Sequence, residues 1–410
     1  MKKLVILGAG TAGTMMANKM ARVLDRTDWQ ITVVDRDGLH HYYQPGYLFV
    51  PFGIYSPRDV VKPRKDYLPP GVEVVISPIE VIEPEQNRVR LSNGRMLGYD
   101  FLIIATGTQP VTAQTEGLGG PGWHQNAFDF YTLEGAAALA RKLQRWEGGR
   151  LVVSVVEMPI KCPVAPLEFA FLADWFFTVR GLRKKVEIEY VTPLSGAFTK
   201  PKASALLGGV LDQKGIKLTA DYSTGRVDTE ARTIHSWDER VVPYDLLVTV
   251  PTNMGDASIA RSGFGDELNY VPTDKHTLRT EVKDNIFALG DATNLPASKA
   301  GSVVHFQAEI LVENLLAAID ERPLHGHYDG HANCFIESGF NKAFLIDFNY
   351  ETEPLPGLFP LPGIGPMALL EETKLNHYGK MMFRWVYWNI LLRGLDLPMD
   401  SAMSMAGKHR

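Results

Sequence analysis

The feature that most constrains the fold of this chain is a glycine-rich turn close to its N-terminus. Residues 4–7 form a continuous apolar run, typical of a strand buried on both faces, and Gly8, Gly10 and Gly13 follow. The next residues place apolar side chains at helical spacing, and Asp35 closes a second apolar run. Such a turn lets the backbone approach a pyrophosphate at the helix N-terminus, while the carboxylate binds a ribose hydroxyl. The pattern predicts dinucleotide binding; the alternative is a glycine-rich turn without a ligand.

Strand-like and helix-like segments alternate along most of the chain. The strand patterns lie at residues 31–34, 101–104, 151–156, 186–191, 246–250 and 286–289, and the helix patterns at 14–24, 133–146, 166–179 and 301–318. Alternation of this kind favours an α/β fold with largely parallel sheets. We expect two Rossmann-like dinucleotide-binding-type domains followed by a C-terminal amphipathic membrane-attachment region.

Composition narrows the function classes. The 410 residues carry a net charge of −5, which argues against nucleic acid as a partner because phosphate binding needs a basic field. The apolar run before Gly8 is too short for a secretory signal, and no stretch reaches the roughly 18–20 apolar residues of a spanning helix. His325, His327 and His331 lack a complete ligand set, so we expect no metal.

Two further motifs indicate which dinucleotide binds. Residues 103–110 read IIATGTQP and residues 286–292 read IFALGDA, and both resemble motifs of two-dinucleotide flavoproteins. In the second motif Asp291 would bind the ribitol of FAD, although alone it could be a helix cap. Together with the first turn, these motifs favour FAD over NAD. The expected FAD-binding residues are Gly8, Gly10, Gly13, Asp35, Ala105, Thr106, Gly107, Gly290, Asp291 and Lys299.

The second strand–helix unit lacks the glycine-rich turn that a nicotinamide dinucleotide needs. Residues 156–166 contain three prolines and no glycine, and prolines lack the amide donors of a phosphate cradle. Cys162 lies in this turn, before the helix. We expect its pKa to be lowered at the helix N-terminus, which would make it a reactive thiolate. The alternative is an inert, buried cysteine.

The chain resembles the sulfide:quinone oxidoreductases, membrane-attached members of the flavoprotein disulfide reductase superfamily. The resemblance covers nearly the whole chain. It is carried by residues 8–13, by 159–166 (PIKCPVAP), by 290–299 (GDATNLPASK) and by Cys334-Phe335. It implies a discontinuous FAD-binding domain at 1–110 and 251–320. It also implies a second Rossmann-like domain without an NAD site at 111–250, and a quinone and membrane-interface region at 321–410.

The resemblance also assigns roles to the two cysteines. Cys334, nearer the flavin, would form the thiolate–flavin adduct, and Cys162 would hold incoming sulfide as a persulfide. Glu168 matches a family carboxylate that could move protons, with a capping or solvated glutamate as the alternative. Residues 107–150 lack the third cysteine of many family members, so we expect non-covalent FAD and leave the sulfur chain length and the thiol substrate open.

The last segment suggests the electron acceptor. Phe335 matches a family aromatic that packs against quinone, and Phe340 and Lys342 are further candidates for quinone binding, with ordinary core packing as the alternative for Phe340. Residues 378–395 combine aromatic, apolar and basic side chains, as interfacial helices do. We expect a peripheral, monotopic attachment to the membrane; a dimer interface or packing on the domain would be the alternative.

These observations predict an enzyme that oxidises sulfide to polysulfide or elemental sulfur and passes electrons through FAD to membrane quinone. A type II NADH:quinone oxidoreductase, the flavoprotein subunit of a flavocytochrome c sulfide dehydrogenase, and a flavin redox sensor without turnover are the alternatives. The sequence fixes neither the quinone nor the subunit number, and a homo-oligomer is compatible with it.

Overall fold

The computed structural model describes residues 1–361 and 365–409. Its first sheet is parallel throughout and has the order β20-β9-β1-β2-β5. The strands of this sheet are β1 (Lys2–Leu7), β2 (Trp29–Asp35), β5 (Glu73–Ile76), β9 (Phe101–Ile104) and β20 (Ile286–Ala288). Apolar runs let the central strands β1 and β9 be buried on both faces, whereas β5 at the edge exposes Val74 and Ile76.

The second sheet is also parallel, with the order β11-β18-β12-β13-β14. Its strands are β11 (Ala127–Phe128), β12 (Gly149–Val155), β13 (Val186–Val191), β14 (Ile216–Thr219) and β18 (Leu246–Val250). The predicted α/β fold with two Rossmann-like units is therefore confirmed.

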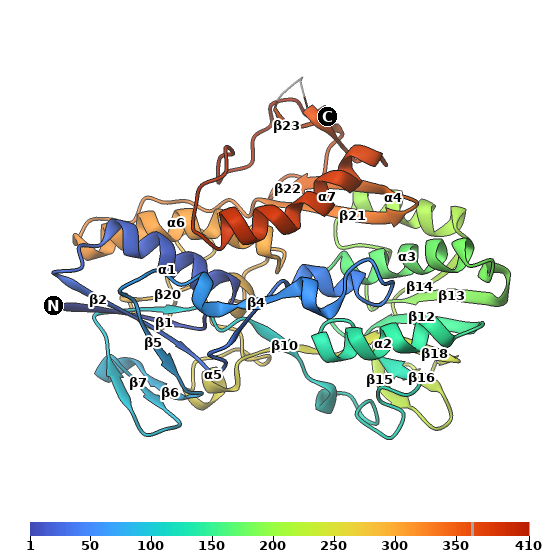
Figure 1. Ribbon diagram of the computed structural model, residues 1–410, viewed down its shortest axis with the longest axis horizontal. Coiled ribbons are helices and arrows are strands. Elements are labelled where there is room, and N and C mark those ends of the chain that lie inside the picture. Colours follow the sequence, from blue (N-terminus) through green and yellow to red (C-terminus); the bar gives the residue numbers. More distant parts are fainter. Residues whose placement is uncertain (362–364, 410) are drawn as a thin grey trace.

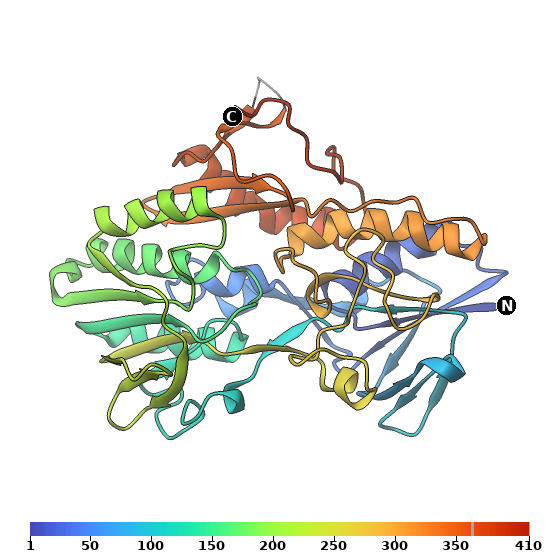
Figure 2. The ribbon, with the colours of Figure 1, turned by 180° about the vertical axis from the view of Figure 1, so that it is seen from behind.

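Helices cover the sheets, and small antiparallel sheets extend them (Figures 1 and 2). The helices are α1 (Thr11–Val23), α2 (Leu133–Arg145), α3 (Ala165–Val179), α4 (Pro201–Gln213), α5 (Ala257–Arg261), α6 (Gly301–Ile319) and α7 (Lys374–Val386). One antiparallel sheet contains β6 (Ile79–Glu83), β7 (Arg88–Leu91) and β8 (Met96–Gly98), and another contains β15 (Thr224–Asp228), β16 (Thr233–Ser236) and β17 (Val241–Pro243). A short pair joins β3 (His40–Tyr42) to β4 (Val61–Pro63).

Two strands connect the halves of the molecule. The chain leaves the first half in β10 (Thr108–Pro110) and returns in β19 (Asn253–Gly255), and the two strands pair antiparallel. The second unit thus begins and ends at one place.

The C-terminal region lies along one side of both halves (Figure 1). Its hairpin of β21 (Ala332–Gly339) and β22 (Lys342–Phe348) contacts α3 of the second unit and α6 of the first. Helix α7 packs on this hairpin and continues into a π-helical turn, Tyr387–Leu391. A second hairpin, β23 (Gly357–Leu361) with β24 (Gly365–Leu369), lies beyond it. The domain boundaries expected from the sequence remain a proposal.

Helix α6 is, within the described ranges, the one helix long and apolar enough to cross a membrane. This differs from the sequence expectation, which required an uninterrupted apolar run. The helix contains Glu309 and Glu313, yet 61% of its apolar window is buried, and it packs against α1. These features are those of a core helix.

Candidate active site

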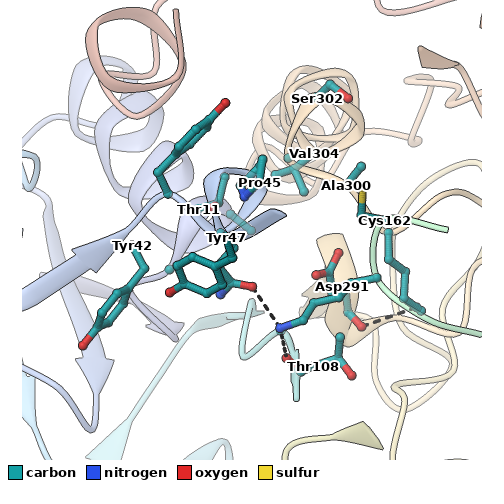
Figure 3. A pocket seen from close by; sticks show the side chains of 18 of the residues that line it. Thr11, Tyr42, Pro45, Tyr47, Thr108, Cys162, Asp291, Ala300, Ser302 and Val304 are labelled. Atoms are coloured by element: carbon teal, nitrogen blue, oxygen red, sulfur yellow. Dashed lines mark hydrogen bonds between the residues drawn. The ribbon is translucent and has the colours of Figure 1, made fainter. Parts of the chain in front are cut away.

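A cavity of about 510 Å³ lies where the first sheet, the second unit and the C-terminal region meet. Its volume is in the range of small-molecule and cofactor sites. Figure 3 shows Tyr42 toward one end and Cys162 toward the other. Twelve of the residues expected from the sequence line it: Gly8, Gly10, Asp35, Ala105, Thr106, Gly107, Cys162, Glu168, Asp291, Lys299, Cys334 and Phe335.

The glycine-rich turn forms one wall because each glycine meets a different steric demand. Gly8 has a φ of +96°, and a Cβ there would lie 2.4 Å from the carbonyl oxygen of Ala105. A Cβ on Gly13 would lie 1.8 Å from the carbonyl oxygen of Gly8. A Cβ on Gly10 would meet nothing within 4 Å, because this residue faces the open cavity. Gly13 and Gly290 do not line the cavity; they let the backbone pack behind it.

The features of this wall fit the polar parts of FAD. Asp35 Oδ2 accepts a hydrogen bond from the Ala9 amide at 2.6 Å and forms an ion pair with Arg64, whose Nη1 lies 2.8 Å away. No side chain caps α1 or α6, and the N-termini of both helices line the cavity, where free amides favour negative charge. The buried Thr106 Oγ1 also has no partner among the described residues. These unpaired donors suit a pyrophosphate and flavin carbonyl oxygens.

Two buried lysines, Lys161 and Lys299, and the partly buried Asp291 line the cavity. Burial raises the pKa of Asp291 and lowers the pKa of Lys299 to about 8, although each charge favours the other. Lys161, from the second unit, has a pKa that burial also lowers. Its Nζ donates to Gln44 Oε1 at 2.9 Å and to the Thr108 carbonyl at 3.4 Å, so it joins the two halves.

The backbone of Cys162 is held on both sides. Its amide donates to the carbonyl of Lys299 at 2.7 Å, and its carbonyl accepts from Tyr131 Oη at 3.1 Å. Its φ is +48°, a conformation that non-glycine residues seldom adopt. Burial raises the pKa of the Cys162 thiol more than the nearby Lys380 charge lowers it. The lowered pKa expected from the helix N-terminus is therefore wrong, because burial is the larger effect.

Cys334 reaches the same cavity from β21. Its residue is 8% exposed, and both Cys162 and Cys334 are free thiols. Burial raises the pKa of Cys334 strongly, and the charge of Cys162 raises it further. Both sulfurs are thus held mainly as thiols at neutral pH.

A buried ion pair lies beside the cysteines. Glu168 on α3 is 1% exposed and is paired with Lys380 on α7. Glu168 Oε1 also accepts the Glu337 amide at 2.6 Å, and Lys380 Nζ donates to the Phe335 carbonyl at 3.1 Å. Burial lowers the pKa of Lys380 to about 7.

A second pair continues toward the surface. His377 Nδ1 lies 2.9 Å from both carboxylate oxygens of Glu337, whose pKa is raised by burial and lowered by this histidine.

The residues expected to bind quinone separate in space. Phe335 lines the cavity, together with Phe383 of α7. Phe340 and Lys342 lie outside it, at the turn of the β21–β22 hairpin. Phe340 is 43% exposed, and Lys342 Nζ pairs with Glu372 Oε2 at 3.1 Å.

Comparisons with known proteins agree with this geometry. The family described as pyridine nucleotide-disulphide oxidoreductase matches residues 2–308. The chain belongs to this family.

Relatives within the family extend the likeness to the C-terminal region. The chain is 27% identical to the mitochondrial sulfide:quinone oxidoreductase of Mus musculus over 96% of this chain and 86% of that protein. It is 28% identical to the mitochondrial enzyme of the same name from Dictyostelium discoideum, with the same two coverages. The crystal structure of the sulfide:quinone oxidoreductase from Aquifex aeolicus has the same fold, with a TM-score of 0.80 at 20% identity, over 96% of this chain and 92% of that chain. The resemblance expected from the sequence is confirmed, and the chain is a flavin-dependent oxidoreductase.

Three residues that line the cavity were not recognised as site residues from the sequence. The amphipathic pattern of residues 378–395 predicts that Lys380 is solvated, but its side chain points inward and is 13% exposed. Its helical spacing from Asn376 and Phe383 was the available signal. Lys161 and Tyr131 gave no comparable signal, because the groups that they contact come from distant parts of the chain.

Proposed function

We propose that this protein is an FAD-dependent sulfide:quinone oxidoreductase. The observation that carries the proposal is that Cys162 and Cys334, the only cysteines of the chain, line the same cavity as the FAD-type motifs. The names of the relatives in two eukaryotes and in Aquifex aeolicus support it.

FAD would be held by the glycine-rich turn, Asp35, the segment from Ala105 to Gly107, and Asp291. When bound, it would accept two electrons from sulfur and pass them to quinone. Lys299 and Lys161 place buried positive charge in the cavity, which stabilises negative charge that develops there. FAD attachment is non-covalent in this proposal, since residues 107–150 contain no cysteine.

The cysteines would carry the sulfur. In the oxidised site one sulfur atom would bridge Cys162 and Cys334 as a trisulfide. Hydrosulfide would attack this bridging sulfur, the bond from it to Cys334 would break, and Cys334 would leave as a thiolate, while Cys162 keeps the bridging sulfur and the new sulfur as a chain that ends in S–H. Formation of a bond between the end of this chain and Cys334 would then release one proton and the two electrons that bound FAD accepts. Oxidation of one hydrosulfide to the level of elemental sulfur releases two electrons and one proton. Reduction of quinone takes up two electrons and two protons, so the site must gain one proton from solvent in each turnover. The product is elemental sulfur or polysulfide.

The Glu168–Lys380 pair can deliver that proton. Both groups lie at the cavity, and Glu337 and His377 extend the polar path toward the surface. Phe335 and Phe383 line the same part of the molecule and would pack against the quinone ring.

The quinone would arrive from a membrane that contacts α7. Leu375, Tyr378, Met382 and Trp385 are exposed and lie on one face of this helix. Such a face binds the interface between lipid headgroups and acyl chains without spanning the bilayer. We assign a peripheral attachment at this face.

The test is an anaerobic titration of the purified holoprotein, followed by the flavin absorbance. We expect sulfide to bleach the flavin and a short-chain quinone to restore it. Cys334→Ser should keep its bound flavin, but sulfide should no longer bleach it. Cys162→Ser tests the other cysteine of the pair in the same way. Bleaching of Cys334→Ser at the wild-type rate would contradict the role of the pair. Bleaching by NADH but not by sulfide would replace the proposal with an NADH:quinone oxidoreductase.

A further inference from the structure

Helix α1 binds the C-terminal segment 387–396 through its polar side chains. Asn18 Nδ2 donates to the carbonyl of Leu392 at 3.0 Å, and Arg22 Nη1 donates to the carbonyl of Gly394. Lys19 pairs with Asp396 next to these contacts. The helix that begins at the glycine-rich turn therefore also binds a segment that lies far away in the sequence.

Tyr387 brings this attachment to the turn itself. Its hydroxyl donates to the carbonyl of Tyr42 at 3.0 Å, so it accepts from Thr11 Oγ1 at 2.8 Å and from His41 Nε2 at 3.0 Å. Burial lowers the pKa of His41 to about 3, and the neutral ring can place its proton on Nε2. The tyrosine is fully buried, and every capacity of its hydroxyl is used.

Tyr387 lies on the side of the helical segment opposite to the exposed Trp385. Trp385, at the end of α7, is 59% exposed, whereas Tyr387 and Trp388 in the wider turn are buried. Side chains two positions apart in a helix of 3.6 residues per turn point roughly 200° apart, so Tyr387 turns inward where Trp385 faces outward.

Thr11 connects Tyr387 to the cofactor cavity. It is the first residue of α1, directly after Gly10, and its side chain lies at the cavity (Figure 3). A Cβ on Gly301, at the start of α6, would lie 3.8 Å from Thr11 and 3.9 Å from Tyr387. The tyrosine thus lies at the junction of the two uncapped helix N-termini.

We propose that Tyr387 is a positioning residue for the phosphate-binding turn and couples FAD binding to the docking of segment 387–396. The docked segment stabilises one position of Thr11 and of the start of α1. Bound FAD stabilises the same position of the turn, and this position is the one to which the segment binds. Because linkage is reciprocal, each event strengthens the other by the same factor. The proposal rests on the FAD site described above.

The first test compares FAD affinity in Tyr387→Phe and in a matched control, Tyr222→Phe. Tyr222 is also fully buried, and its hydroxyl donates to the carbonyls of Ile234 and Arg240 in the second unit, away from the cavity. Apoprotein is titrated with FAD, and the quenching of flavin fluorescence is measured. We expect Tyr387→Phe to weaken FAD binding about fivefold, the size of one lost buried hydrogen bond, and Tyr222→Phe to change it less than twofold.

The second test reads the segment itself. Trypsin cleavage after Arg393 is followed by mass spectrometry with and without FAD. In the wild type, FAD should slow this cleavage, and in Tyr387→Phe the protection should fall by the same factor as the affinity. Thr11→Val removes the same hydrogen bond from the other side and should reduce the protection similarly.

Unchanged FAD affinity and unchanged protection in Tyr387→Phe would overturn the coupling while leaving the proposed function intact. Failure of the wild type to bind FAD would overturn both. If Tyr387→Phe does not fold, Thr11→Val decides between these outcomes.

Discussion

At the scale of single residues, Cys162 has a backbone and a side chain with unusual properties. Its φ of +48° is maintained by hydrogen bonds to Lys299 and Tyr131, so the sulfur is positioned by its neighbours rather than by local preference. Its thiol has a raised pKa because it is buried. The reactivity of Cys162 must therefore come from the position of its sulfur and from the negative charge that hydrosulfide brings as the nucleophile.

The raised pKa predicts a specific pH profile for alkylation of Cys162. In the Cys334→Ser holoprotein only this thiol remains, and a thiol with a raised pKa loses its proton at higher pH than free cysteine. The rate of iodoacetamide labelling should therefore keep rising through pH 9 and stay below that of glutathione at each pH. Labelling that levels off below pH 8 would indicate a lowered pKa instead.

Two glycines of the turn should respond differently to the same substitution. In Gly13→Ala, the new methyl group would lie 1.8 Å from a backbone oxygen, so the fold itself is strained. We expect a loss of about 3 kcal/mol in the free energy of unfolding, the upper end for an overpacked site. Gly10→Ala should leave apoprotein stability unchanged, because nothing lies within 4 Å, but should weaken FAD binding. Urea unfolding and FAD titration of both variants separate these effects; equal stability losses would contradict the assignment.

At the scale of elements, the Glu168–Lys380 pair joins α3 to α7. Lys380→Met alone leaves the carboxylate of Glu168 buried without its counterion and should lower the free energy of unfolding by about 3–5 kcal/mol. The double variant with Glu168→Leu removes both charges and should recover most of this loss. Urea unfolding of the two singles and the double measures the coupling, and additive losses would show that the pair does not act as a unit.

The elements themselves could largely be predicted, whereas the directions of single side chains on them could not. The patterns at 133–146 and 166–179 correspond to α2 and α3 within one residue at their ends. Lys380 could not be placed, because an amphipathic pattern assigns a lysine to the solvent side unless its buried partner is known. The pKa of Cys162 was mispredicted for a similar reason: proximity to a helix is visible in a sequence, but burial by three separate regions is not.

At the scale of the whole molecule, one side should meet the membrane. Met382 and Trp385 on α7 are 56% and 59% exposed. Replacing both by Glu should weaken binding to phosphatidylcholine vesicles about tenfold or more, since burying one large apolar side chain is worth about 1.5–3 kcal/mol. Trp237→Glu is the matched control, because Trp237 is 79% exposed but belongs to the second unit. Co-sedimentation measures vesicle binding, and an equal loss of binding in the control would show that α7 is not the membrane-binding element.

The pairing of β10 with β19 has a consequence for the order of biosynthesis. Strand β20, the neighbour of β9, leaves the ribosome only after the whole second unit. Until then β9 is an unpaired edge strand of the first sheet. Because the second unit begins and ends at that strand pair, it can fold completely during the wait without displacing the first. The cavity then closes only when the C-terminal residues Cys334 and Lys380 have emerged. Loading of the cofactor is therefore a late event in the life of the nascent chain.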